Sequence, residues 1–170
     1  SVPVTMLEYV YRQEEGSGIT ALANMVNQGK LTGIGVVSDV ISAHVLNPDE
    51  ALPLVTKYAK EAYEEYGLLG FTVLAPGHRG SAGVKALNDA IRQAINPGAK
   101  GSKFIAGDRV MVTKNNYQHD VFNGDVGIVR KSHPDGSIEV DFGDNWVTFG
   151  AKNDQAPLDI LQLAFASTIH

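Results

Sequence analysis

The chain has 170 residues, of which 44% are hydrophobic, and a formal net charge of −5. That length fits one domain with a small insert, and the chain has no cysteine, which excludes disulfides and thiolate metal sites. The acidic balance argues against strong nucleic-acid binding driven by counterion release alone. Because the sequence has neither a signal peptide nor a run of about 18 apolar residues, we expect a soluble cytoplasmic protein without membrane contact.

The first part of the chain begins with a strand pattern and a helix pattern. Residues 2–11 are apolar enough for a buried strand. Ser17 is a plausible N-cap for a helix that ends at Gly29, because apolar residues follow it at helical spacing: Ile19, Leu22, Ala23 and Val26. Residues 38–46 are predicted to form a second strand.

Two further helices flank a predicted buried strand. We place the start of the first helix near Glu50, because a start at Pro48 would leave Pro53 beyond the first turn without its hydrogen bond. Its inner face consists of Leu52, Val55, Ala59 and Ala62. Residues 71–75 form an apolar run typical of a parallel strand covered on both faces. Ser81 is predicted to cap the next helix, whose core face is Val84, Leu87, Ile91 and Ile95.

The second part of the chain is rich in short strands. After a linker over 98–105, strands are predicted at Arg109–Thr113, Val126–Lys131, Ile138–Phe142 and Trp146–Phe149. So many short strands within about fifty residues indicate a compact barrel. The apolar run after Pro157 is predicted to return to the first layer. The expected domains are an α/β part over 1–100, a barrel over 101–156, and a return strand over 157–170 that looks cut short.

Three segments could carry chemistry. Arg12, in Tyr11-Arg12-Gln13, could hold a phosphate with its planar guanidinium, or simply pair with a neighbouring glutamate on the surface. The segment Ala75–Gly83 joins a strand to a helix N-terminus, where anions are favoured, and it carries His78 and Arg79. The alternative is that the segment is a glycine-rich turn with a solvated arginine and no binding role. No GxxxxGK[ST] motif occurs in the chain.

The third segment is Lys114-Asn115-Asn116-Tyr117. Its tyrosine could stack on a base and its lysine could hold a phosphate. The alternative is that the two asparagines only satisfy the backbone of a turn. We assign no metal role to His119 or His133, and interpret the scattered aspartates as solvated turn residues.

Residues 107–129, GDRVMVTKNNYQHDVFNGDVGIV, resemble the small barrel inserted in the second motor domain of RecD-like superfamily 1 DNA helicases. The resemblance implies an α/β fold: part of a RecA-like parallel-sheet motor domain with an inserted Src-homology-3-like β-barrel. It also implies that YRQ is helicase motif IV, so that Arg12 would contact the γ-phosphate of ATP as a catalytic residue, with Gln13 in the same cleft.

The same resemblance assigns residues to single-stranded DNA. His78 and Arg79 would grip the strand or support the ATP cleft, and the loop Lys114, Asn115, Asn116 and Tyr117 would contact it in the barrel. Thr168-Ile169-His170 is similar to the first half of motif V, which would place Thr168 and His170 against the DNA backbone. No metal ligand is expected in the chain.

The implied function is that of the C-terminal part of an ATP-dependent 5′-to-3′ DNA helicase of the exonuclease V α-subunit type, active in DNA repair and recombination. ATP and Mg²⁺ would bind in the full-length protein, and the implied partners are single-stranded DNA, the N-terminal motor domain and possible nuclease-complex subunits. Without a P-loop, this piece alone is expected to be neither an ATPase nor a helicase.

Two alternatives remain open. The chain could be a non-catalytic helicase-like module that binds single-stranded DNA or docks to protein within a larger protein such as a conjugative relaxase. A weaker alternative is that only the barrel matters, as a ribosome-style or peptide-binding module. An intact P-loop upstream would favour the motor, and a degenerate one would favour the binding module.

Overall fold

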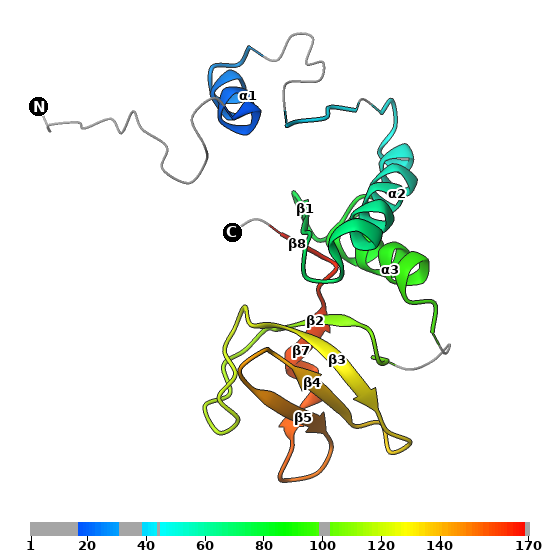
Figure 1. Ribbon diagram of the computed structural model, residues 1–170, viewed down its shortest axis with the longest axis vertical. Coiled ribbons are helices and arrows are strands. Elements are labelled where there is room, and N and C mark those ends of the chain that lie inside the picture. Colours follow the sequence, from blue (N-terminus) through cyan, green and yellow to red (C-terminus); the bar gives the residue numbers. More distant parts are fainter. Residues whose placement is uncertain (1–16, 31–38, 44, 99–102, 169–170) are drawn as a thin grey trace, which may run out of the picture. The chain divides into compact units, whose positions relative to one another are not determined.

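The computed structural model describes residues 17–30, 39–43, 45–98 and 103–168, in two compact units, 1–45 and 46–170 (Figure 1). In the first unit, helix α1 (Gly18–Asn27) starts after Ser17, whose hydroxyl oxygen accepts a hydrogen bond from the backbone N–H of Ile19 at 3.2 Å. The helix ends before Gly29, which takes a positive φ of 68°. The helix predicted from Ser17 is therefore confirmed.

The two strands predicted in the first part of the chain have different outcomes. The strand predicted over 2–11 lies outside the described residues. The strand predicted over 38–46 was wrong for its described residues, of which only Val40 makes a bridge. The reason lies in the pattern: Val40 and Ile41 are adjacent, as are Val45 and Leu46, so the apolar residues do not share one face of a strand.

Helix α2 (Pro48–Tyr66) begins two residues before the predicted start near Glu50. Pro48 occupies the first helical position, where a missing N–H costs nothing. The Glu50 carboxylate accepts hydrogen bonds from the Leu46 N–H at 3.1 Å and from the Asn47 side-chain amide at 3.3 Å, which closes the start of the helix. Pro53 is tolerated inside, because the 19-residue helix loses only one of its many hydrogen bonds.

The α/β part of the second unit is built on two parallel strands, β1 (Val73–Ala75) and β8 (Ala166–Thr168). Helix α3 (Val84–Ile95) packs against α2 and β8. The buried residues of this core are Ala59, Ala75, Val84, Leu87, Ile91, Phe165 and Ala166. The expectation of a strand covered on both faces was wrong within this unit, because the Leu74 side chain is 56% exposed.

Six strands form a curled sheet in the order β6-β5-β4-β3-β2-β7. They are β2 (Arg109–Val112), β3 (Val126–Ser132), β4 (Ile138–Asp141), β5 (Trp146–Gly150), β6 (Ala156–Pro157) and β7 (Leu161–Leu163), with a short 3₁₀ helix η1 (Leu158–Ile160) before β7. Strands β2, β3, β4 and β5 match the four predicted strands to within one residue at their ends. Their inward residues form a separate core around Val110, Val129, Val140 and Phe149, all 0% exposed.

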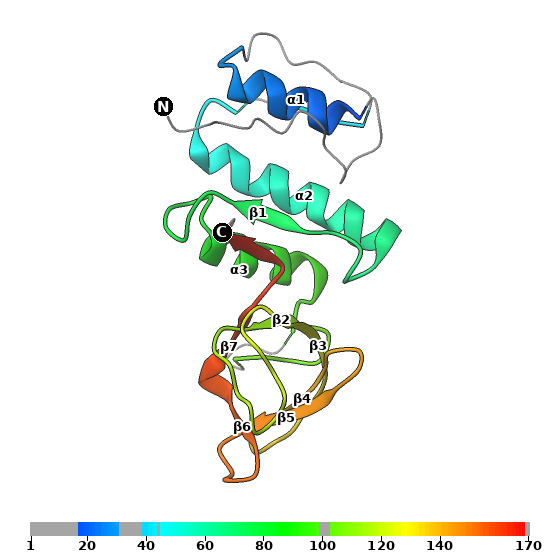
Figure 2. The same cartoon turned by 90° about the vertical axis from the view of Figure 1, so that its left-hand side faces the viewer.

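The chain returns to the first layer later than residue 157, where the sequence placed the return. Strand β7 still belongs to the curled sheet, because Val110 pairs with Leu163 and Val112 with Leu161. Only β8 lies beside β1, and Figure 2 shows it leaving the barrel to reach that position. The barrel is thus an insertion between α3 and β8.

Two adjacent buried residues join the barrel to the α/β part. Asp108 is 0% exposed, and its Oδ1 accepts hydrogen bonds from Arg92 Nε at 2.9 Å and from the Asn96 side-chain amide at 3.0 Å. Arg92 Nη2 lies 2.7 Å from Asp108 Oδ2, in ion-pair contact without the angle of a hydrogen bond. Arg109 donates to the carbonyl oxygens of Phe71 at 2.5 Å and Leu68 at 3.3 Å.

Candidate nucleic-acid interface

The register of the parallel pair places Thr168 beside the glycine-rich loop. Val73 pairs with Ala166, Leu74 with Ser167 and Ala75 with Thr168. Because parallel strands end at the same edge, Thr168 lies next to the point where the loop to α3 begins. Thr168 therefore lies at the edge from which the chain continues to His78 and Arg79.

The loop between β1 and α3 is held tightly by its own backbone. Gly77 O accepts a hydrogen bond from Val84 N at 3.0 Å, and Gly80 O accepts one from Gly83 N at 3.1 Å. Gly80 has a φ of +89°, which favours glycine. The helix begins after Gly83, so the prediction that Ser81 caps it was wrong: the chain makes one more turn before the first helical residue.

The start of α3 favours a negatively charged ligand. The Gly77 carbonyl accepts from the Val84 N–H, but no side chain caps the helix and no acidic residue lies in its first turn, so no negative charge offsets the helix dipole there. His78 and Arg79 are exposed, and neither side chain makes a hydrogen bond or an ion pair with any described residue. The His78 imidazole and the Arg79 guanidinium are therefore available to a ligand.

Asn88 is a positioning residue that the sequence analysis missed. It is 4% exposed, its side-chain amide donates to Ala166 O, and its Oδ1 accepts from Ala166 N, both at 2.9 Å. This reciprocal pair fixes β8 to α3 two residues before Thr168. A signal was available: Asn88 interrupts the apolar stripe of the predicted helix at a core position.

In the barrel, the loop after β2 is held by its asparagines. Asn115 Oδ1 accepts a hydrogen bond from Asn123 N at 2.8 Å, and its Nδ2 donates to the Tyr117 hydroxyl at 3.2 Å. Asn116 Oδ1 accepts from the His119 N–H at 3.3 Å. These contacts favour the alternative that the amides serve the turn.

The other two side chains of the loop are exposed, although the Tyr117 hydroxyl accepts the hydrogen bond from Asn115. Tyr117 is 78% exposed, with its ring edge-to-face against Phe122 at 5.8 Å, and Lys114 is exposed without a partner among the described residues. The structure does not bring this loop to the strand edge: its hydrogen bonds stay within the barrel. Arg12, Gln13 and His170 lie outside the described residues.

The perturbed carboxyl groups of the barrel belong to its turns and ion pairs. The Gly143 N–H, and then Arg130, lowers the pKa of Asp141, while Lys131 lowers the pKa of Glu139. His133 Nε2 lies 3.0 Å from the same Glu139. In the described part of the chain, no group of three His, Cys, Asp or Glu residues has the spacing to hold a metal ion, and no helix is long and apolar enough to cross a membrane.

Comparison with known proteins shows what this chain is similar to. Residues 87–142 match the family model described as the ATP-dependent RecD-like DNA helicase SH3 domain. The ATP-dependent RecD2 DNA helicase of Deinococcus radiodurans is 30% identical over 175 residues, which cover 100% of this chain and 23% of that protein. The chain therefore spans about a quarter of the length of this relative.

Solved structures of Pif1 from a Bacteroides species, one unliganded and one in complex with ADP-AlF4, are 18% identical. Each match covers 94% of this chain and 41% of the Pif1 chain, with TM-scores of 0.40 and 0.39. The architecture agrees with the predicted α/β fold, part of a RecA-like motor domain interrupted by a small SH3-like barrel. The barrel's family match and the alignment along the whole chain make this chain similar to the RecD-like DNA helicases.

Proposed function

We propose that this chain forms part of the second motor domain of an ATP-dependent DNA helicase, and that it holds single-stranded DNA at the edge where β1 and β8 end. The family supports the class of activity. The observation that carries the DNA site is the pairing of Ala75 with Thr168, which sets Thr168 beside the loop with its unpaired His78 and Arg79.

The chemistry of this edge suits a phosphodiester backbone. Arg79 supplies a fixed positive charge with several donors, and the start of α3, which no side chain caps, supplies a partial positive charge. A threonine hydroxyl and a histidine ring add hydrogen bonds without reading base sequence. The edge therefore fits a strand gripped by its backbone, as a motor that moves along any sequence requires.

The barrel loop is a second proposed contact. The exposed ring of Tyr117 is available to stack on a base and Lys114 to meet a phosphate, while Asn115 and Asn116 hold the loop in shape. Stacking on an aromatic face is tolerant of sequence, in keeping with a motor.

The ATP-dependent steps are proposed for a longer protein that contains this chain. There, Arg12 and Gln13 would reach ATP and Mg²⁺ held mainly by the N-terminal motor domain, and an arginine at the γ-phosphate stabilises the charge that develops during phosphoryl transfer. Movement in the 5′-to-3′ direction, a place in DNA repair or recombination, and association with other nuclease subunits belong to the same proposal.

The DNA edge is tested with the 170-residue chain and a fluorescent oligothymidylate. We expect Arg79→Ala to weaken binding and to lower the slope of log affinity against log salt by about 0.7, the share of one phosphate contact on a single strand. Thr168→Val should weaken binding without changing that slope. Fluorescence anisotropy over a series of salt concentrations measures both quantities.

Lys60→Ala is the matched control. Lys60 lies on the exposed surface of α2, 4.0 Å from Glu64, and its replacement removes the same charge elsewhere. Equal effects of Arg79→Ala and Lys60→Ala would show that binding follows net charge alone, which would overturn the proposed edge. If the edge holds but the longer protein has no ATPase activity, the non-catalytic module is the better description.

A further inference from the structure

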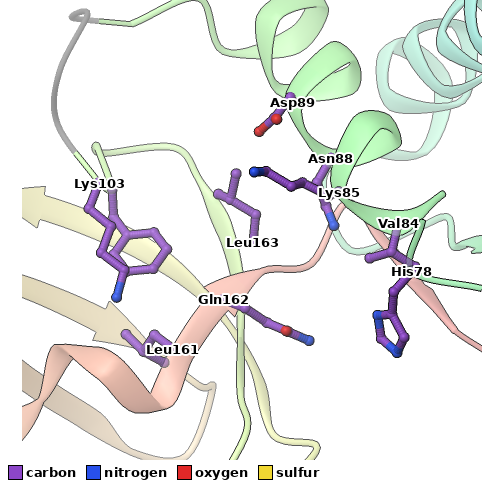
Figure 3. A pocket seen from close by; sticks show the side chains of 10 residues that line it. His78, Val84, Lys85, Asn88, Asp89, Lys103, Leu161, Gln162 and Leu163 are labelled. Carbon is purple, nitrogen blue, oxygen red and sulfur yellow. The ribbon is translucent and has the colours of Figure 1, made fainter. Parts of the chain in front are cut away.

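A cavity of about 540 Å³ opens between α3 and barrel strand β7 (Figure 3). Its walls are mostly apolar and come from Val84, Phe104, Leu161 and Leu163. Its polar side chains are His78, Lys85, Asp89, Lys103 and Gln162, together with the structural Asn88. The volume lies within the range of small-molecule sites, and an apolar wall with a few polar groups is their usual composition.

Most of the polar groups around this cavity have no partner. The side chains of Lys85, Asp89 and Gln162 make no hydrogen bond or ion pair within the described part of the chain. Lys103 donates to Leu158 O at 2.9 Å, and its Nζ lies 5.2 Å from the centre of the Phe104 ring. Three polar tips are thus solvated and ready to meet a ligand.

The charge around the cavity is opposite to that of the chain. Two ammonium groups, on Lys85 and Lys103, face one carboxylate, on Asp89, whereas the whole chain carries −5. Low-dielectric walls strengthen the field of such groups inside a cleft. The net charge of these three groups therefore attracts a ligand with a negative group to this cavity.

The cavity continues from the strand edge. His78 belongs both to the loop after β1 and to the cavity lining, while Gln162 lies on β7 of the barrel. In Figure 3 the Gln162 amide extends toward the side where His78 lies. A strand held at the β1–β8 edge therefore has a path into the space between α3 and the barrel.

We propose that this cavity holds one nucleotide of the bound single strand. The base packs against the apolar walls, Gln162 meets its polar edge, and Lys85 and Lys103 meet the flanking phosphates. The inference rests on the proposed function, because it extends the same DNA path. It adds Lys85, Lys103 and Gln162 as contact residues, none of which the sequence motifs singled out.

The double variant Lys85→Ala/Lys103→Ala tests the charged part. In the 170-residue chain we expect oligothymidylate affinity to fall on the order of tenfold, and the salt slope to fall by about 1.4, because two phosphate contacts are lost. Lys57→Ala/Lys60→Ala removes the same charge from α2, where both lysines pair with glutamates, and serves as the control. If both double variants behave alike, the cavity does not hold DNA.

A cross-link tests the position directly. The chain has no cysteine, so Gln162→Cys introduces a single thiol at the cavity. We expect its thiolate to attack an oligothymidylate base that carries a tethered mixed disulfide, forming a protein–DNA disulfide and releasing the small thiol, and Lys131→Cys in the barrel not to do so. Absence of the Gln162→Cys cross-link under conditions where the oligonucleotide is bound would overturn the inference.

The two proposals fail differently. If Arg79→Ala weakens binding while the cavity variants match their controls, the strand edge stands and the nucleotide site is wrong. If Arg79→Ala has no effect but Gln162→Cys cross-links, the strand follows another path into the cavity. If the chain binds no oligothymidylate even at low salt, both proposals are wrong.

Discussion

Asp135 is the most strongly perturbed carboxyl group among the described residues. Ser137 Oγ donates to Asp135 Oδ1 at 2.6 Å, the Ser137 N–H donates to the same atom at 3.0 Å, and Lys152 Nζ lies 3.1 Å from Oδ2. These contacts, the Ser137 hydroxyl first, hold the pKa of Asp135 well below its ordinary value of 3.8. Each of them favours the charged form of the carboxyl group.

The sign of the resulting pH dependence follows from linkage. A carboxyl group whose pKa is lower in the folded state stabilises the fold above its unfolded pKa, and this stability is lost as the pH falls below about 4. We therefore expect Asp135→Asn to lose less stability between pH 5 and pH 3 than the wild type. Urea unfolding at both pH values measures the difference. Asp144→Asn, an exposed aspartate in another turn, should keep the wild-type loss, and an equal loss in both variants would contradict this account.

Single residues were predictable where local chemistry decides their role. Ser17 and Gly29 stand at the start and at the end of a helix, which neighbouring residues alone determine. Asn88, Asp108 and Arg109 gain their roles from partners far along the chain, so a local pattern could not assign them. Of the proposed DNA residues, the asparagines of the barrel loop prove to be occupied by backbone contacts.

At the scale of elements, the loop before α3 depends on one glycine without a positive φ. A Cβ at Gly83 would lie 2.5 Å from Arg79 O and 2.7 Å from His78 O, closer than real contacts allow. We expect Gly83→Ala to shift this loop, to lower the free energy of unfolding by roughly 1–3 kcal/mol, and to weaken oligothymidylate binding. Chemical denaturation and anisotropy measure the two effects.

Gly77→Ala is the control from the same loop. A Cβ at Gly77 meets no atom within 4 Å, and no positive φ is required there. We expect this variant to keep the stability and DNA affinity of the wild type. If it were as damaging as Gly83→Ala, the loop would be sensitive to any added methyl group and the steric argument would be wrong.

Element types were predicted better than element starts. The four barrel strands and the three described helices were found, because apolar spacing defines them. The starts of α2 and α3 were misplaced, since Glu50 closes the first through contacts with Leu46 and Asn47, and backbone hydrogen bonds within the loop set the second at Gly83. Such contacts are formed in three dimensions and have weak signatures in a single sequence.

At the scale of the whole second unit, Arg109 joins two cores. It is buried, and its guanidinium supplies donors to two carbonyl oxygens in the connection between α2 and β1. We expect Arg109→Met to leave those oxygens without donors, to cost roughly 2 kcal/mol, and to uncouple the barrel from the helices. The single tryptophan, Trp146, reports on the barrel and far-UV circular dichroism on the helices.

In the wild type the two probes should give one unfolding transition, and in Arg109→Met they should separate. Arg130→Met is the matched control, because Arg130 pairs with Asp141 inside the barrel and makes no link to the helices. Coincident transitions in Arg109→Met would show that the two cores remain coupled through other contacts, chiefly the ion pair of Arg92 with Asp108.

The sequence predicted the two parts of the fold correctly but not the boundary at which the barrel ends. An α/β part and a small barrel follow from the change in apolar spacing along the chain. The barrel's last strand was assigned to the wrong layer, because the apolar run after Pro157 contains two short strands that serve different sheets. Only pairing partners distinguish Leu161–Leu163 from Ala166–Thr168.

Because the barrel is inserted between α3 and β8, the two parallel strands are neighbours in space but about ninety positions apart in sequence. Closing so long a connection costs conformational entropy and is therefore slow, whereas hairpins inside the barrel close quickly. Assembly of the barrel shortens the effective tether and delivers β8 to its place. A destabilising substitution in the barrel core would therefore also affect Thr168, because β8, the strand that ends there, would pair with β1 late or incompletely.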